Sequence, residues 1–216
     1  MASKTTLTAF VILLIISHPS MANPLLQQQQ KGFNGITGFS ANLTFDKFNA
    51  SGTLTSVEII VNLQITGGIL TITNDSSDPA SGTFEFGTNA MLVPNGISLV
   101  GVPGIVQAFN SLSVHLNGND NDIYNGGIVS PGPQSGFIDS SYWSQYEGTG
   151  SYNINVKTYP WTNYNVTGQI EYSATPPPAA SGYIEVIYAY NPIPEPATIT
   201  LLCTGALALL KRKSSK

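Results

Sequence analysis

Charged residues are scarce in this sequence: Asp, Glu, Lys and Arg together make up 9% of its 216 residues. Helical bundles and coiled coils need many more Glu, Lys and Arg residues, so the composition argues against both. Glycine (21 residues) and proline (14 residues), which mark turns, are plentiful. Because hydrophobic residues still reach 42%, a wholly disordered chain is excluded. The composition therefore predicts one globular domain of strands and turns.

Cysteine and histidine are nearly absent, which limits the chemistry open to the chain. The single cysteine, Cys203, lies near the C-terminus, so a domain upstream of it can form no disulfide, thiol nucleophile or thiolate metal site. His115 lies on the polar side of a predicted strand, with no Gly-x-Ser-x-Gly motif to accompany it. We therefore expect neither an enzyme nor a cofactor. A glycoside hydrolase, which needs two facing carboxylates, is a distant alternative that would draw on Asp139, Glu147, Glu171 and Glu185.

The N-terminal segment 1–22 has the layout of a secretory signal peptide. Lys4 supplies a positive start, residues 7–16 form an apolar run, and small residues lead to a cleavage site at Ala22. The apolar run is too short to cross about 30 Å of hydrocarbon as a helix. We expect signal peptidase to cut between Ala22 and Asn23, which makes residues 23–193 an extracellular domain.

The C-terminal segment 194–216 combines three features in a fixed order. The motif Pro194-Glu195-Pro196 is followed by the apolar stretch 197–210 and then by the basic residues Lys211, Arg212 and Lys213. This layout resembles the PEP-CTERM sorting signal of Gram-negative bacteria, which is recognised by a membrane protease called exosortase. The resemblance implies transient membrane anchoring, cleavage by an exosortase-type protease, and delivery to the cell surface or an exopolysaccharide matrix. A permanent tail anchor is the alternative.

The physical properties of this tail agree with the resemblance. Fourteen residues at about 1.5 Å each would form a short membrane helix of about 21 Å. The basic residues after it should stay on the cytoplasmic side of the membrane. We therefore expect the domain to lie on the periplasmic side before its release.

Removal of both terminal segments would make the remaining domain strongly acidic. Three basic residues, Lys31, Lys47 and Lys157, would face eleven acidic ones, a net charge of −8. Such a surface repels phosphate backbones and has almost no Lys or Arg for counterion release. We therefore expect no nucleic-acid partner.

Hydrophobic and polar residues alternate through the central region, the pattern of half-buried strands. The clearest run is 57–66, after which Gly67-Gly68 predicts a hairpin turn into a returning strand over 70–73. Further runs at 39–45, 84–86, 97–100, 112–116, 152–156, 166–172 and 184–190 bring the total to about nine or ten strands. The pattern predicts an all-β antiparallel sandwich, jelly-roll or Ig-like, flanked by the signal helix and the short membrane helix.

Few parts of the domain differ from this strand pattern. Residues 24–31 and 103–112 are predicted as short helices, and 117–133 as a long loop. The stretch Leu43 to Asn74, with Phe45-Asp46 and the sequence GTLTSV at 52–57, is similar to the choice-of-anchor E domain. Members of that family are secreted bacterial proteins that often carry a PEP-CTERM tail. The resemblance implies no site residues.

Two groups of residues suggest a binding function. Six aromatic residues stand among Ser, Thr, Asn and Gly: Tyr142, Trp143, Tyr146, Tyr159, Trp161 and Tyr164. Flat aromatic faces beside amides and hydroxyls suit sugars, so a carbohydrate-binding module with exopolysaccharide as its partner is the alternative function. Packing of both tryptophans in or against the core is the competing and favoured interpretation.

The second group lies in the Asn-, Asp- and Gly-rich segment 117–127. Asp120 and Asp122 are weak candidates for calcium ligands. Asn, Asp and Gly are also the usual residues of ordinary turns, so we favour a loop without metal.

Overall fold

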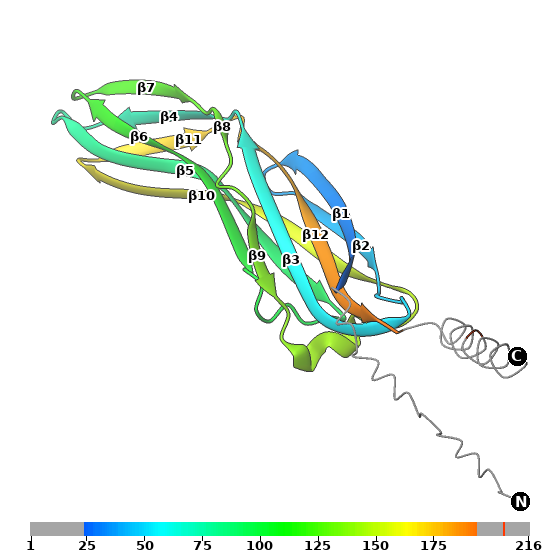
Figure 1. Cartoon of the computed structure of the whole chain (residues 1–216). Coiled ribbons are helices and arrows are strands. Elements are labelled where there is room, and N and C mark those ends of the chain that lie inside the picture. Colours follow the sequence, from blue (N-terminus) through cyan, green and yellow to red (C-terminus); the bar gives the residue numbers. More distant parts are fainter. Residues whose placement is uncertain (1–23, 194–204, 206–216) are drawn as a thin grey trace, which may run out of the picture.

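The computed structural model describes residues 24–193 and 205 and is built almost entirely of antiparallel strands (Figure 1). The strands are β1 (Leu25–Ile36), β2 (Ser40–Asp46), β3 (Gly52–Thr66), β4 (Ile69–Asn74), β5 (Ala80–Asn95), β6 (Ile105–Leu116), β7 (Asp120–Asn125), β8 (Ile128–Val129), β9 (Gln134–Phe137), β10 (Ser151–Thr167), β11 (Ile170–Ala174) and β12 (Ala179–Pro192). A 3-10 helix, η1 (Ser140–Gln145), lies between β9 and β10. The prediction of an all-β antiparallel fold is confirmed, with twelve strands in place of nine or ten.

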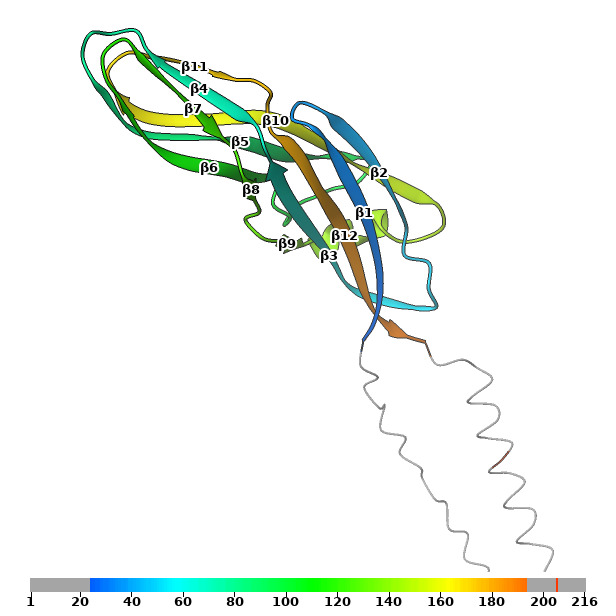
Figure 2. The ribbon, with the colours of Figure 1, turned by 90° about the horizontal axis from the view of Figure 1, so that it is seen from above.

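One long sheet extends through the molecule, and two shorter sheets pack against it end to end (Figures 1 and 2). The long sheet has the order β2-β10-β5-β6, and β5 and β10 have 16 and 17 residues. Near the chain ends it packs against the sheet β1-β12-β3, which β8 and β9 extend. Farther out it packs against the sheet β11-β4-β7. We call these two parts the proximal half and the distal half.

Each half has its own hydrophobic core, formed by the inward-facing residues of the alternating pattern. The proximal core includes Phe45, Ile59 and Ile154, and the distal core includes Ile72 and Phe84, all with essentially no exposed surface. Burial of this apolar surface is the main stabilising term of the fold.

A belt of hydroxyl groups separates the two cores. Thr88 and Thr158 are buried where the long sheet changes from one partner sheet to the other. The hydroxyl oxygens of Thr37 and Thr88 lie 2.6 Å apart, and the Thr37 hydroxyl donates to the carbonyl oxygen of Pro178 at 2.7 Å. These hydrogen bonds satisfy polar groups that would be costly to bury without a partner.

The predicted hairpin between 57–66 and 70–73 is wrong. Gly67 and Gly68 both have positive φ, but they lead the chain from β3 into a different sheet, where β4 pairs with β11 and β7. The neighbouring positions beside β3 are already taken by β12 on one side and by β8 and β9 on the other. The turn signal was correct, but turn chemistry alone does not determine which strands pair.

The two predicted helices are also wrong, because both segments are strands. Residues 24–31 fall in β1, where they pair with β12, and residues 103–112 fall largely in β6, where they pair with β5. Cross-strand hydrogen bonding and packing override weak local helix propensity in such short segments.

Three further boundaries differ from the predictions. The predicted loop 117–133 contains β7 and β8, and β7 pairs along its length with β4. Residues 97–100 are not a strand, although Ile97 packs into the proximal core. The predicted strand 166–172 is interrupted at Gly168, whose φ of 93° marks the turn from β10 to β11.

The two ends of the described domain lie side by side. Leu25, at the start of β1, pairs with Tyr190 near the end of β12, at the end of the molecule opposite the tip of the distal half (Figure 2). The predicted signal helix and membrane helix lie outside the described residues. Among the described residues, no helix has the length and apolar character needed to cross a membrane.

Candidate binding surface

The six aromatic residues proposed for sugar contact do not form one surface. Tyr142 and Trp143 lie on η1 and pack against the proximal core, and Tyr146 is fully buried in it. Tyr159 and Trp161 lie on the outer face of β10, whereas Tyr164 contacts Phe84 of the distal core. The structure therefore leaves two of the six, Tyr159 and Trp161, together on an open sheet face.

Trp143 is held in place by the start of η1. Its indole Nε1 donates to the carbonyl oxygen of Ile138 at 3.0 Å. Asp139 caps the helix, and its Oδ1 accepts from the hydroxyl and the backbone N–H of Ser141 at 2.7 and 2.9 Å. These two hydrogen bonds hold the pKa of the Asp139 carboxyl below its usual value. A structural role for Trp143 agrees with the favoured interpretation of the sequence.

Tyr146 belongs to a buried tyrosine cluster in the proximal core. The hydroxyl oxygens of Tyr152 and Tyr188 lie 2.7 Å apart, and the Tyr188 hydroxyl donates to the carbonyl oxygen of Asp46 at 3.0 Å. The Tyr146 hydroxyl donates to the carbonyl oxygen of Ser98. Burial raises the pKa of all three phenols, that of Tyr188 to about 12. These tyrosines are therefore structural and are not available for stacking on a ligand.

Phe109 extends the open face formed by Tyr159 and Trp161. Trp161 of β10 and Phe109 of β6 both lie opposite Gly87 of β5, and their ring centroids are 4.9 Å apart. We call Phe109, Tyr159 and Trp161 the sheet-face patch. Phe109 and Tyr159 are 36% and 43% exposed, so the patch can be reached from solvent. Phe109 was missed by sequence reasoning because its segment was predicted to be a helix.

Polar side chains border the sheet-face patch. Asn89 and Gln107 lie in the same cross-strand row as Tyr159. In the described part of the chain, the buried Oδ1 of Asn89 has no hydrogen-bond partner. Two residues beyond Trp161 on β10, Asn163 lies opposite Glu85 of β5 and donates from Nδ2 to its Oε2 at 3.1 Å. Aromatic rings beside amide groups could contact a sugar, but two of the three rings, those of Phe109 and Trp161, already pack on each other.

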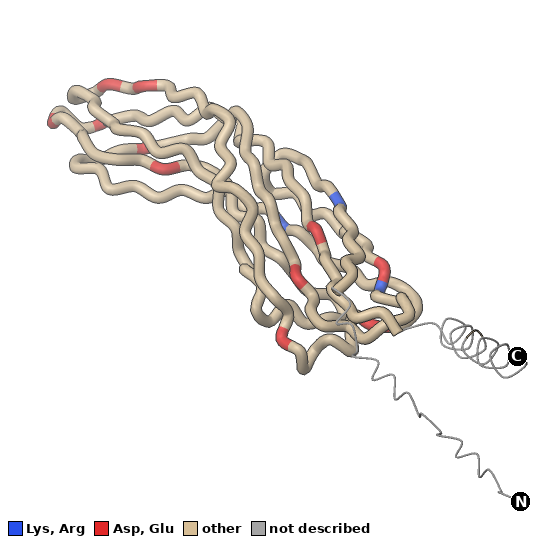
Figure 3. Tube along the Cα trace, in the orientation of Figure 1, with Lys and Arg blue, Asp and Glu red and all other residues tan. Residues whose placement is uncertain are grey.

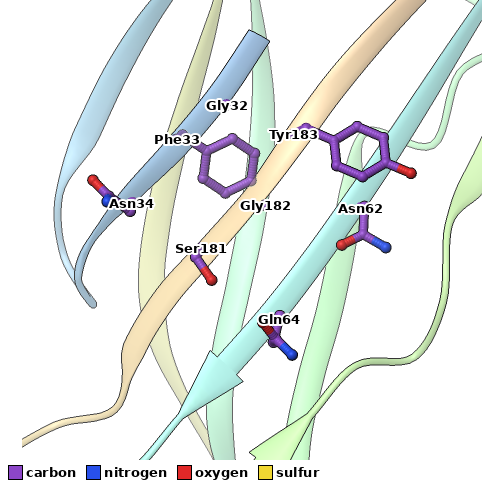
Figure 4. A pocket seen from close by; sticks show the side chains of 8 residues that line it. All are labelled: Gly32, Phe33, Asn34, Asn62, Gln64, Ser181, Gly182 and Tyr183. Carbon is purple, nitrogen blue, oxygen red and sulfur yellow. The ribbon is translucent and has the colours of Figure 1, made fainter. Parts of the chain in front are cut away.

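A second surface feature is a hollow on the outer face of the sheet β1-β12-β3, with a volume of about 470 Å³ (Figure 4). Its lining residues are Gly32, Phe33, Asn34, Asn62, Gln64, Ser181, Gly182 and Tyr183. They form three cross-strand rows, in which Gly32, Tyr183 and Asn62 stand opposite one another, as do Asn34, Ser181 and Gln64. Sequence reasoning did not find this hollow, because its residues lie on three strands far apart in the chain.

A third feature is a cleft of about 500 Å³ at the distal tip, between β10 and β11. Tyr164 forms one wall, and Asp75 and Glu171 supply carboxylates. Tyr164 and Tyr172 pack edge to face at 5.7 Å and both contact Phe84, so these rings mainly close the open side of the distal core.

The weak metal candidates lie on a regular strand. Asp120 and Asp122 are in β7, opposite Asn74 and Ile72 of β4. Asp122 lies close to Tyr124 and, after burial, is the next cause of the raised pKa of that phenol. Within residues 24–193, no three His, Cys, Asp or Glu side chains gather as metal ligands would. His115 is exposed on β6, on the polar side as predicted.

No protein-family model matches the chain. No curated protein matches it either. Among solved structures, a chain from the structure of infectious bursal disease virus Gx strain is similar at 11% sequence identity, with a TM-score of 0.17. The alignment covers 87% of this chain and 49% of that one, so this chain spans about half the length of the viral one. A similarity this low carries no argument about fold or function.

Proposed function

We propose that this protein is an exported, non-enzymatic component of the cell surface or of an extracellular polysaccharide matrix. In this proposal residues 1–22 are a signal peptide, residues 23–193 are a jelly-roll or Ig-like sandwich domain, and residues 194–216 are a PEP-CTERM sorting signal. The partners are signal peptidase, which cuts between Ala22 and Asn23, and an exosortase-type protease acting at the Pro194-Glu195-Pro196 motif.

The observation that carries the proposal is the position of the chain ends. Leu25 and Tyr190 pair with each other, so the described domain begins and ends at the same end of the molecule (Figure 2). A membrane tether at that end would leave the distal half pointing away from the membrane. The acidic domain without cysteine is compatible with this location, because it needs no disulfide and remains soluble outside the cell.

A carbohydrate-binding module is the second candidate function. The observation that favours it is the exposure of Tyr159 and Phe109 beside Trp161 on one sheet face, with amide groups around them. Aromatic rings with polar neighbours are a common platform for sugar rings. Both functions are compatible, since a matrix protein can hold the polysaccharide around it.

Replacement of the sorting motif tests the main proposal. In the variant Pro194→Ala/Glu195→Ala/Pro196→Ala, we expect the full tail to be retained and the protein to remain in the membrane fraction. The wild-type protein should lose the tail and reach the cell surface or medium. The measurement is immunoblotting of membrane, surface and medium fractions, with Ser214→Ala/Ser215→Ala as a control that alters the tail outside the motif. Identical distribution of the triple variant and wild type would contradict the proposal.

A further inference from the structure

We infer that the hollow on the outer face of β1, β12 and β3 binds an uncharged carbohydrate, with a sugar ring seated over Gly32 beside Tyr183. The inference deepens the carbohydrate-binding candidate of the proposed function, on which it rests, and places the contact at a different surface from the sheet-face patch. Three observations carry it: the glycine at the floor, the polar groups around it, and the absence of charge in the lining.

Gly32 is a glycine that the fold itself does not require. Its φ is not positive, and a Cβ atom added there would meet only the carbonyl oxygen of Gly182, at an ordinary contact distance of 3.6 Å. Glycine within a strand costs stability relative to alanine, by about 0.5–1 kcal/mol. A strand glycine often marks a point where a ligand or another backbone approaches closely. Here no other backbone forces the choice, and the missing side chain keeps the hollow open.

Gly182, on the neighbouring strand, shows the contrast. A Cβ atom at Gly182 would collide with the backbone carbonyl oxygen of Asn62, so close strand packing accounts for that glycine. Of the two glycines in the hollow, only Gly32 is left without a structural reason.

The side chains around Gly32 suit the hydroxyl groups of a sugar. Asn34, Asn62 and Gln64 bring amide groups, which both donate and accept hydrogen bonds, and Ser181 adds a hydroxyl (Figure 4). In the described part of the chain, none of these four side chains is engaged in an intramolecular hydrogen bond. Tyr183 adds a flat ring at the side of the hollow, so that the site combines one apolar face with several polar groups (Figure 4).

The charge around the hollow selects an uncharged ligand. None of its eight lining residues is charged. The nearest charged side chain on the same face of β12 is that of Glu185, two residues beyond Tyr183, and the domain is acidic overall. Lys31, the exposed residue before Gly32, is outside the lining and has the opposite charge to Glu185. An anionic polymer would therefore find no Lys or Arg in the hollow itself to pair with. A volume of about 470 Å³ is within the range of small-ligand sites.

Affinity electrophoresis tests the inference on the full protein, purified from whichever cell fraction holds it. Native gels would contain dextran, hydroxyethylcellulose or, as the anionic probe, alginate. We expect at least one of the two neutral polysaccharides to retard the wild-type protein, and alginate not to retard it. Gly32→Leu, which fills the hollow, and Tyr183→Ala should each weaken retardation about tenfold or more. Gly104→Leu, at another exposed glycine with open space around it, and Trp161→Ala should keep it.

Three results would overturn the inference. The first is that neither neutral polysaccharide retards the wild-type protein. The second is that both Gly32→Leu and Tyr183→Ala are retarded as strongly as the wild type. The third is that only Trp161→Ala loses retardation, which would move the contact to the sheet-face patch. Thermal unfolding of each variant is measured in parallel, and if Gly32→Leu fails to fold, Gly32→Ala and Tyr183→Ala decide the question. Because binding is measured on purified protein, a failure of export or tail processing would be seen separately.

Discussion

Two buried phenols, those of Tyr152 and Tyr188, share a hydrogen bond on which only Tyr152 depends. The Tyr188 hydroxyl donates to the carbonyl oxygen of Asp46, so the Tyr152 hydroxyl is the donor in the 2.7 Å contact between the two rings. The same Asp46 carbonyl oxygen also accepts from Nε2 of Gln29 at 2.9 Å. Tyr188 is therefore the partner on which Tyr152 relies, whereas Tyr188 keeps an acceptor if Tyr152 loses its hydroxyl.

This asymmetry gives a residue-scale prediction. Tyr188→Phe leaves the buried Tyr152 hydroxyl without its acceptor, and we expect the free energy of unfolding to fall by about 1–3 kcal/mol. Tyr152→Phe, the matched control, removes only the donor of that bond and should cost about 1 kcal/mol or less. Urea unfolding of both variants measures the difference. Equal losses in the two variants would show that the hydroxyl groups do not depend on each other in this way.

The placement of single aromatic residues could be predicted only in part. The inward positions 152, 154 and 156 are even, and continuing this alternation would have placed Tyr159 and Trp161 on one face of β10 and Tyr164 on the other. The alternation of burial ends at Thr158, however, and Tyr164 is 52% exposed although its ring packs on Phe84. Phe109 could not be placed in this way, because its segment, 103–112, was predicted as a helix. Gly32 follows the predicted helix 24–31 and lies outside every predicted strand. Tyr146 donates a hydrogen bond to Ser98, which lies 48 residues away in the chain, so its burial leaves no local signal.

At the scale of elements, the sequence pattern predicts which segments are strands but not which strands pair. Alternation identified β3, β12 and the first half of β10, because each buries one face against a core. The same pattern is silent about which strands are neighbours, and β4 joins β11 and β7, not β3. The edge strand β1 has four consecutive glutamines, so its strand structure comes from pairing with β12 and not from a hydrophobic pattern.

The two glycines of the β1-β12 pair give an element-scale prediction. Gly182→Ala should lower the free energy of unfolding by more than about 1 kcal/mol, because the added methyl group collides with the backbone of β3. Gly32→Ala should leave it unchanged or raise it by up to about 1 kcal/mol, because the site has room and alanine restricts the unfolded chain. Thermal and urea unfolding of the two variants provide the test. A loss of stability in Gly32→Ala as large as in Gly182→Ala would remove the argument that Gly32 is kept for a ligand.

At the scale of the whole molecule, the basic residues lie in the same half of the domain as the chain ends, and the other half is acidic. The basic residues Lys31, Lys47 and Lys157 all lie in the proximal half, nearer the chain ends (Figure 3). The described distal half contains only acidic residues among its charged ones, namely Asp75, Asp78, Glu85, Asp120, Asp122 and Glu171 (Figure 3). In the proposed location, such an acidic half would repel neighbouring copies of the protein.

The overall class of this molecule was predictable because it depends on composition and period-two alternation. Its two-part construction, with one long sheet and two shorter ones, was not, since it depends on where β3 and β11 leave one half for the other. The proposed export and sorting would depend on terminal segments outside the described residues, so they are best tested on the protein in the cell.

Intact-mass analysis of the native protein from cell-surface and culture-medium fractions tests the central proposal most directly. The proposal predicts a species that starts at Asn23 and ends close to Pro194, which would demonstrate both cleavage steps. A species that retains Lys216 in these fractions would contradict it, because the tail would then be a permanent anchor and not a sorting signal.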